Sequence, residues 1–161
     1  MRETACHAPG SFSWADLATT DPAGAKIFYT RLFGWKAVDM PVPGSVYSML
    51  KQGGKNVCAL YDMQADMRSQ GVPAHWQSYV TVENVDEAAD KARSLDATVV
   101  APPFDAMEAG RMAVILDSGR ATFAMWQAGN SSGAGLRHKL KRLVVRPNFV
   151  DLMARTPVCV D

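Results

Sequence analysis

An internal repeat constrains the fold of this 161-residue chain more than any other feature of the sequence. Residues 77–84 align with residues 14–21, and both segments have the pattern of a strand that ends in a polar helix cap. Later in each copy the aligned segments are 47–50 with 112–115 and 54–61 with 119–126. These later segments form the pattern of a strand, a glycine-containing turn and a second strand. The repeat therefore predicts a β-α-β-β-β module that occurs twice.

Each copy of the repeat contains one helix with recognisable ends. Asp21, which stands before a proline, and Gly34 predict a first helix over Pro22–Phe33. Asn84 begins a capping-box pattern and predicts a second helix over Val85–Leu95. The apolar side chains that stand out are Ile27, Phe28, Leu32 and Phe33 in the first helix and Ala88, Ala92 and Leu95 in the second. The second set is spaced as in an amphipathic helix.

The repeat divides the chain into five predicted segments. They are an N-terminal extension (1–10), a first module (11–61), a linker (62–74), a second module (75–128) and a basic tail (129–161). From residue 130 onward, six basic residues stand against two acidic ones. Residues 129–135 have the composition of a flexible linker. The basic stretch has no aromatic residue for base stacking, which disfavours a role in nucleic-acid binding.

Composition excludes several classes of function. The hydrophobic fraction is 48%, the charged fraction is 20% and the net charge is +1, so we expect no nucleic-acid partner. No apolar run is long enough to cross a bilayer, and the first residues lack the apolar core of a signal peptide. Cys6, Cys58 and Cys159 are too few and too widely spaced for a disulfide framework or a zinc knuckle. We therefore expect a cytoplasmic protein without a membrane partner.

The motifs of the repeat resemble those of one known superfamily. Residues 25–35 are similar to the A-x-x-F-Y-x-x-L-F-G-W signature of the vicinal-oxygen-chelate proteins, which include glyoxalase I, bleomycin-resistance proteins and extradiol dioxygenases. Residues 82–88 resemble their V-x-D-V-D-E-A element, and residues 123–127 resemble an F-A-L-W-Q ending. The resemblance covers residues 11–128. It implies an α+β fold in which two βαβββ modules form a curved, barrel-like mixed sheet with the helices outside.

The resemblance also implies where a metal would bind. Metal-dependent members place a His or Gln on the first strand and a Glu on the fourth strand of each module. These positions carry Trp14, Ala59, Gln77 and Ala124 in this sequence. Only Gln77 has a coordinating atom, because an indole is a donor without an acceptor and alanine has no polar group. We therefore predict that the metal site of the family is absent and that no cofactor is bound.

A different metal arrangement remains open. His75 and Gln77 lie two residues apart on one strand face, and Asp16 shares a face with Trp14. Together with Glu108 they would form an unorthodox set of ligands. However, His75 stands close after a proline at a strand entrance, where a histidine usually faces solvent.

Strand positions that face the cleft of the implied fold define the candidate ligand site. The predicted ligand-binding residues are Trp14, Asp16, Ala59, Tyr61, Gln77, Tyr79, Ala124 and Trp126. Aromatic walls suit a flat molecule, and a few polar groups would orient it. The same aromatics also fit an ordinary core, and the resemblance is what favours a ligand site. It implies a protein that binds a small aromatic or planar organic molecule between the modules, as the bleomycin-resistance members do.

An enzymatic function is the alternative. Asp16 is the single ionisable acid of the predicted set, and burial beside aromatics would raise its pKa and suit a general acid or base. The chain would then be a lyase, isomerase or dioxygenase of the same superfamily that acts on a small metabolite. Asp16 would be catalytic without a metal, or the unorthodox ligands would hold one. The resemblance further implies a homodimer.

Overall fold

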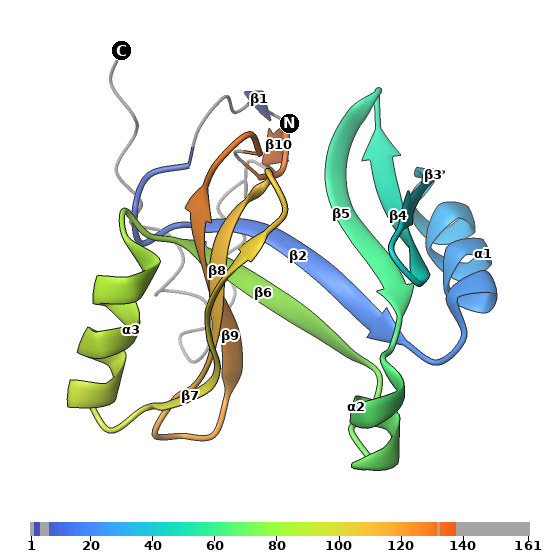
Figure 1. The fold of residues 1–161 in the computed structure, drawn as a ribbon. Helices are drawn as coiled ribbons and strands as arrows, with labels where there is room; N and C mark the ends of the chain where they lie inside the picture. The colour runs from blue at the N-terminus through green and yellow to red at the C-terminus, as the bar shows by residue number, and fades with distance from the viewer. Residues whose placement is uncertain (1, 4–6, 132, 138–161) are drawn as a thin grey trace, which may run out of the picture.

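The computed structural model describes residues 2–3, 7–131 and 133–137, which form an eight-stranded mixed sheet flanked by helices (Figure 1). The strands of this sheet are β2 (Phe12–Thr19), β3 (Lys36–Val42), β4 (Ser45–Gln52), β5 (Lys55–Asp62), β6 (His75–Thr81), β7 (Thr98–Ala106), β8 (Gly110–Leu116) and β9 (Thr122–Ala128). The helices are α1 (Pro22–Phe33), α2 (Ala65–Ser69) and α3 (Val85–Ser94). The short strands β1 (Arg2–Glu3) and β10 (Leu136–Arg137) pair with each other.

The sheet confirms the predicted pair of β-α-β-β-β modules. Its strand order is β3-β4-β5-β2-β6-β9-β8-β7, so each module contributes four adjacent strands. The first and last strands of each module are parallel neighbours, β2 with β5 and β6 with β9. The two modules join through the antiparallel pair β2 and β6, in which Asp16 lies opposite Gln77. The sheet is curved but not closed, because β3 and β7 are its two edges.

Local signals place α1 where the sequence predicts it. The Asp21 carboxylate accepts a hydrogen bond from the Gly24 amide at 2.9 Å and caps the first turn. At the other end Gly34 has a φ of +69°, and its amide donates to the Thr30 carbonyl at 2.9 Å. Glycine enters this left-handed conformation without steric cost, so the helix stops there.

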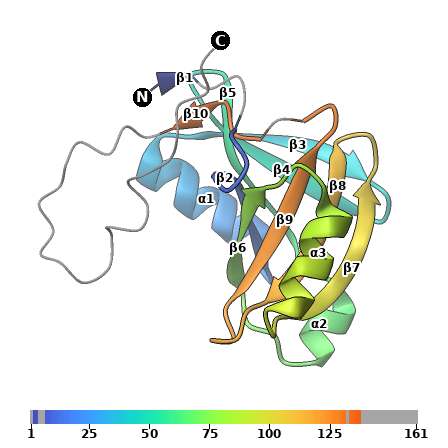
Figure 2. The ribbon, with the colours of Figure 1, turned by 90° about the vertical axis from the view of Figure 1, so that its left-hand side faces the viewer.

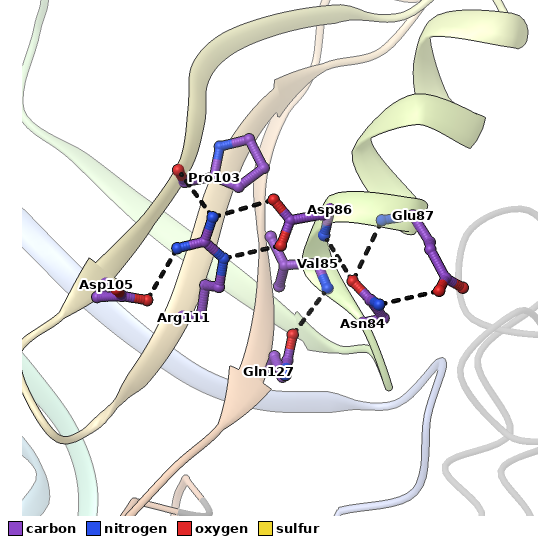
Figure 3. A network of polar contacts seen from close by, with 8 residues as sticks. All are labelled: Asn84, Val85, Asp86, Glu87, Pro103, Asp105, Arg111 and Gln127. Carbon is purple, nitrogen blue, oxygen red and sulfur yellow. Dashed lines mark hydrogen bonds and ion pairs between the residues drawn. The ribbon is translucent and has the colours of Figure 1, made fainter.

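Side-chain oxygens also fix the start of α3 (Figure 3). The side-chain oxygen of Asn84, Oδ1, accepts from the backbone amides of Asp86 and Glu87, at 2.9 and 3.2 Å, as the capping box predicts. The amide of Val85 donates to the Gln127 side chain at 3.0 Å, a bond that ties the helix to β9. The helix ends at Ser94, one residue before the predicted end.

A group of ion pairs attaches the same end of α3 to the sheet (Figure 3). Arg111 on β8 donates to both carboxylate oxygens of Asp86, at 2.8 and 3.0 Å, and to Asp105 on β7 at 2.9 Å. The hydrogen bonds from Arg111 lower the pKa of Asp86. The hydrogen bonds with Asp86 and Asp105 raise the pKa of Arg111. These groups lie at the surface and link three elements of the second module, so we assign them a structural role.

Each module has an apolar cluster between its half of the sheet and its helix. Beneath α1 the buried residues are Leu17, Leu50, Cys58 and Leu60. Beneath α3 they are Val85, Ala89, Ala113, Ile115 and Met125. The two helices differ, because α3 buries Val85 and Ala89 whereas α1 has no fully buried side chain. The exposure of the apolar residues of α1 is a feature that the sequence pattern did not predict.

The described parts of the predicted extension and tail pack on both modules, and the amides of residues 129–131 donate to the carbonyls of Glu108 and Ala109 in the second module. The Ala134 amide donates to the Ser13 carbonyl at 2.8 Å, and the Gly135 amide donates to the Asn56 carbonyl at 3.0 Å. His7 is buried, and its Nε2 lies 3.0 Å from the Ala134 carbonyl oxygen. These contacts differ from the flexible linker that the composition predicts. The basic residues beyond Arg137 lie outside the described residues.

Within the described ranges, no helix has the length and apolar character that a membrane span requires.

Candidate functional site

The candidate site occupies the face of the sheet that is turned away from α1 and α3, which we call the inner face. Figures 1 and 2 show these two helices outside the two halves of the sheet. Along β2, Leu17 packs in the cluster beneath α1, whereas Trp14 packs with Tyr79 and Trp126 in a cluster without helix residues. Alternation along the strands therefore places the predicted site residues on the inner face, because successive side chains point to opposite faces.

Asp16 is the buried acid at the centre of this face. Its side chain is only 3% exposed. The hydroxyls of Tyr47 and Tyr79 both donate to its Oδ2 atom, at 2.9 and 3.0 Å. Among the described residues nothing donates to its other oxygen, Oδ1, although that atom is buried too. One oxygen of the carboxyl group is therefore satisfied and the other is left for a further donor.

Burial raises the pKa of Asp16 from 3.8 to about 6. The hydrogen bonds from Tyr47 and Tyr79, and the nearby His75, act in the opposite direction and stabilise the carboxylate. The pKa values of the two tyrosines shift as well. Burial, followed by the Asp16 charge, raises the pKa of both hydroxyls, so they remain protonated donors at neutral pH.

Trp14 fixes the direction of this hydrogen-bond chain. Its indole Nε1 donates to the Tyr47 hydroxyl oxygen at 3.0 Å. Because an indole N–H can only donate, Tyr47 must be the acceptor in that bond and is free to give its own proton to Asp16. The chain from Trp14 through Tyr47 to Asp16 therefore holds the carboxyl group from one side, and Tyr79 holds it from the other.

The repeat explains why these groups meet. Asp16 and Tyr79 are 63 positions apart in sequence, which makes them equivalent residues of the two modules. Since β2 and β6 are antiparallel neighbours, equivalent inner-face positions are brought together at the seam between the modules. One copy supplies the acid there and the other supplies its hydroxyl donor.

The structure brings the other predicted residues to the same face. Ala59 lies beside Asp16 in the strand register, Ala124 lies beside Tyr79, and both alanines are fully buried. Gln77 is buried opposite Asp16, but its amide donates to the Ser78 carbonyl at 3.3 Å and makes no recorded bond to the acid.

The two remaining predicted aromatics lie on the strands that flank β2 and β6, namely β5 and β9. Trp126 packs edge-on against Tyr79, with ring centroids 6.2 Å apart. Tyr61 contributes an aromatic ring from β5 and is half-buried. Burial raises the pKa of Tyr61 to about 12, with a further contribution from the Asp16 charge.

Tyr47 is the site residue that the sequence analysis missed. It lies on β4 directly opposite Tyr61, and the two rings stack at 6.1 Å. The alternation that places Tyr61 on the inner face also applies to the neighbouring strand. A register drawn between residues 45–52 and 55–62 would have identified Tyr47 as a member of the site.

The unorthodox metal arrangement does not assemble in the part of the chain that the structure describes. There, no three His, Cys, Asp or Glu side chains come together in a way that could hold an ion. Glu108 is exposed in the turn between β7 and β8, and His75 Nδ1 lies 2.9 Å from the Pro73 carbonyl oxygen. The four positions that the family uses for a metal carry one amide, one indole and two methyl groups on this inner face.

A groove of about 410 Å³ lies away from this site, near the start of α3. Its lining residues are Pro9, Gly10, Val82, Glu83, Asn84, Glu87, Ala88 and Lys91. The side-chain oxygen of Asn84, Oδ1, is already used there in capping the helix. We assign the groove no function, since it holds no buried polar group in need of a partner.

Three comparisons relate the chain to known proteins. The model of the Glyoxalase/Bleomycin resistance protein/Dioxygenase superfamily matches residues 11–125. CFP32 of Mycobacterium tuberculosis, whose name links it to the glyoxylases, is 41% identical over 137 residues, which are 84% of this chain and 52% of CFP32. The anthracycline biosynthesis protein DnrV of Streptomyces peucetius is 34% identical over 138 residues, 79% of this chain and 50% of DnrV. The chain thus spans about half the length of these relatives.

Solved structures show the same fold at low sequence identity. A methylmalonyl-CoA epimerase of Streptomyces coelicolor matches with a TM-score of 0.57 at 16% identity, over 75% of this chain and 99% of the epimerase. The methylmalonyl-CoA epimerase of Mycobacterium tuberculosis matches with a TM-score of 0.54 at 15% identity, over 74% of this chain and 88% of that protein. These matches support the paired-module architecture that the strand order shows.

Proposed function

Since the chain belongs to the glyoxalase/bleomycin resistance protein/dioxygenase superfamily, we propose that it binds a small planar or aromatic organic molecule on its inner face. The observation that carries this proposal is the state of Asp16, a buried carboxyl group with one oxygen held by two tyrosines and the other without a donor. A hydroxyl or amine of a ligand would satisfy that oxygen.

Aromatic rings surround the acid. They are Trp14, Tyr47, Tyr61, Tyr79 and Trp126. Planar ligands gain both apolar burial and ring stacking against such walls. The fully buried Ala59 and Ala124 stand where metal-dependent members carry glutamates, and their small side chains take up less of the space beside the acid.

The donor set argues for binding without the family metal. Of the four equivalent positions, only Gln77 offers an oxygen, and a single neutral amide does not hold a divalent cation against water. Purified protein exposed to Zn²⁺, Ni²⁺, Mn²⁺ or Fe²⁺ and then passed through gel filtration should retain no stoichiometric metal. Stoichiometric retention of any of these ions would contradict this part of the proposal.

The name of one relative agrees with the class of ligand. DnrV is named as an anthracycline biosynthesis protein, and anthracyclines contain a planar polycyclic ring system with hydroxyl groups. A molecule of that chemistry has a flat face for Trp14 and Tyr79 and hydroxyl donors for Asp16. We therefore choose doxorubicin, alizarin red S and 2,3-dihydroxynaphthalene as probes.

Isothermal titration with these probes tests the proposal. We expect at least one to bind, and Trp14→Ala to weaken its affinity by about tenfold or more, a loss of about 1.4 kcal/mol. Trp76→Ala is the matched control, because Trp76 lies on the opposite face of β6 from Gln77 and should leave the affinity unchanged. Equal affinities for wild type and Trp14→Ala would show that the inner face is not the site.

A second candidate function is acid/base catalysis in the same place. A carboxyl group with a pKa of about 6 exchanges its proton near neutral pH, and Oδ1 is the atom at which a proton would be taken up and returned. Asp16→Asn separates the two candidates. It should abolish turnover of a substrate in an enzyme, and it should change ligand affinity only modestly in a binding protein.

A further inference from the structure

The repeat makes the two halves of the inner face directly comparable. On the first module a cross-strand row joins Tyr61 on β5 to Tyr47 on β4, which lie directly opposite each other. On the second module the equivalent row joins Trp126 on β9 to Met112 on β8, which are also directly opposite. In the alignment of the two copies, Tyr61 corresponds to Trp126 and Tyr47 corresponds to Met112. The same place in the two modules therefore carries different chemistry.

The row of the first module carries hydroxyl groups beside the buried acid. The Tyr47 hydroxyl donates to Asp16 Oδ2 and holds the carboxyl group in place. Tyr61 lies two residues after Ala59, the register partner of Asp16, and the Asp16 charge acts on its hydroxyl. No described residue forms a hydrogen bond with that hydroxyl. This half of the inner face therefore offers two unused polar atoms, Asp16 Oδ1 and the Tyr61 hydroxyl oxygen.

The row of the second module offers apolar surface at the equivalent place. The Trp126 indole N–H already donates to the Ser131 carbonyl at 3.1 Å. Phe104 on β7 lies directly opposite Met112, extends the row to the edge of the sheet and is 44% exposed. A thioether sulfur is only a weak acceptor, and a phenyl ring carries no hydrogen-bonding group. Such a surface suits an aromatic ring without polar substituents.

Gly110 fixes the Trp126 ring over this row. A Cβ atom added at Gly110 would lie 2.6 Å from Cζ2 of Trp126 and 2.5 Å from the Gln127 carbonyl oxygen. The indole therefore lies against the backbone of β8, where a residue without a side chain leaves room for it. Because the bond to Ser131 holds the ring as well, the indole N–H would have to give up that bond to reach a ligand.

The difference between the two rows gives the ligand a direction. Building on the proposed function, we propose that the ligand is a planar molecule with its hydroxyl groups at one end only. The hydroxylated end lies over Asp16 and Tyr61, and the unsubstituted ring end lies over Trp126 and Met112. A hydroxyl at the far end would lose its water without gaining a protein partner, which is unfavourable.

Two isomers of one compound test this direction. 2,3-Dihydroxynaphthalene carries both hydroxyls at one end, whereas 2,6-dihydroxynaphthalene carries one at each end and has the same size and composition. By isothermal titration we expect the full 161-residue chain to bind the 2,3 isomer about tenfold or more tightly than the 2,6 isomer.

Two variants assign the preference to the two rows. Tyr61→Phe should weaken binding of the 2,3 isomer about threefold or more, and Tyr29→Phe on α1, outside the inner face, is its matched control. Met112→Gln supplies the second module with a hydrogen-bonding group and should strengthen binding of the 2,6 isomer by a similar factor. Circular dichroism would verify that these variants are folded.

The outcomes separate this inference from the proposed function. Equal affinities for the two isomers, or a ratio that neither Tyr61→Phe nor Met112→Gln changes, would overturn the inference. So would tighter binding of the 2,6 isomer, for which Thr81 at the end of β6 offers a buried Oγ1 without a partner among the described residues. In each case, loss of affinity for both isomers in Trp14→Ala would leave the inner face as the site. No binding of the 2,3 isomer would overturn the inference, and no binding of any probe would overturn the proposed function too.

Discussion

The position of the Asp16 side chain depends on neighbours from its own strand and from three other strands. Trp14 on β2 and Tyr47 on β4 hold one side, Tyr79 on β6 holds the other, and Ala59 on β5 packs beside it. Two hydroxyl donors lower the cost of burying a charge, yet burial still dominates and the pKa rises to about 6. The residue is therefore costly for the fold, which is common where a side chain serves a function.

The cost of Asp16 predicts how stability depends on pH. The folded chain holds the Asp16 proton more tightly than the unfolded chain, because the pKa is about 6 in the former and 3.8 is its ordinary value. As the pH rises from about 4 to about 6, the free energy of unfolding should therefore fall by up to about 3 kcal/mol. Above pH 6 the titration of Asp16 should change it no further. Asp16→Asn has no such proton and should remove this fall.

Urea unfolding of the wild type and of Asp16→Asn at pH values between 4 and 7 measures the difference. Asp62→Asn is the control, since Asp62 is exposed at the end of β5 and pairs with Arg68 at the surface. Parallel stability curves for the wild type and Asp16→Asn would mean that Asp16 is not buried as a titrating group.

At the scale of elements, the cap of α3 is a local device with a measurable effect. Asn84→Ala removes the oxygen that accepts from Asp86 and Glu87, so we expect a loss of about 1 kcal/mol in the free energy of unfolding. Asn84→Ser retains a capping oxygen and should lose only a small part of this. If both variants unfold at the wild-type denaturant concentration, the cap contributes nothing, and the ion pairs of Arg111 and the bond from Val85 to Gln127 hold this end of the helix.

The helices show which features of an element can be predicted from the sequence. Asp21, Gly34 and Asn84 act through bonds within a few residues, so the starts of α1 and α3 and the end of α1 were predicted correctly, whereas α2 lies in the segment predicted as a linker. The exposure of Phe28 and Leu32 was not predicted, because a pattern of apolar residues does not reveal how far the sheet of the same chain covers them.

At the scale of the whole molecule, the repeat predicted most of the fold. Two copies of one strand and helix pattern implied two modules, and strand alternation placed Trp14, Asp16 and Tyr79 on one face, as the structure shows. The contact between Asp16 and Tyr79 depends on how β2 and β6 pair, and the bond from Tyr47 depends on the register of β4 with β5. Such pairings join residues far apart in sequence, and local patterns do not determine them.

The titration of the Asp16 carboxyl carbon, followed by NMR with and without the tightest-binding of the three probes, tests the central claim most directly. In the free protein we predict a midpoint near pH 6. With saturating probe the midpoint should fall, because a donor at Oδ1 stabilises the carboxylate. A midpoint near pH 4 in the free protein, or one that saturating probe leaves unchanged, would contradict the assignment of Asp16 to a ligand site.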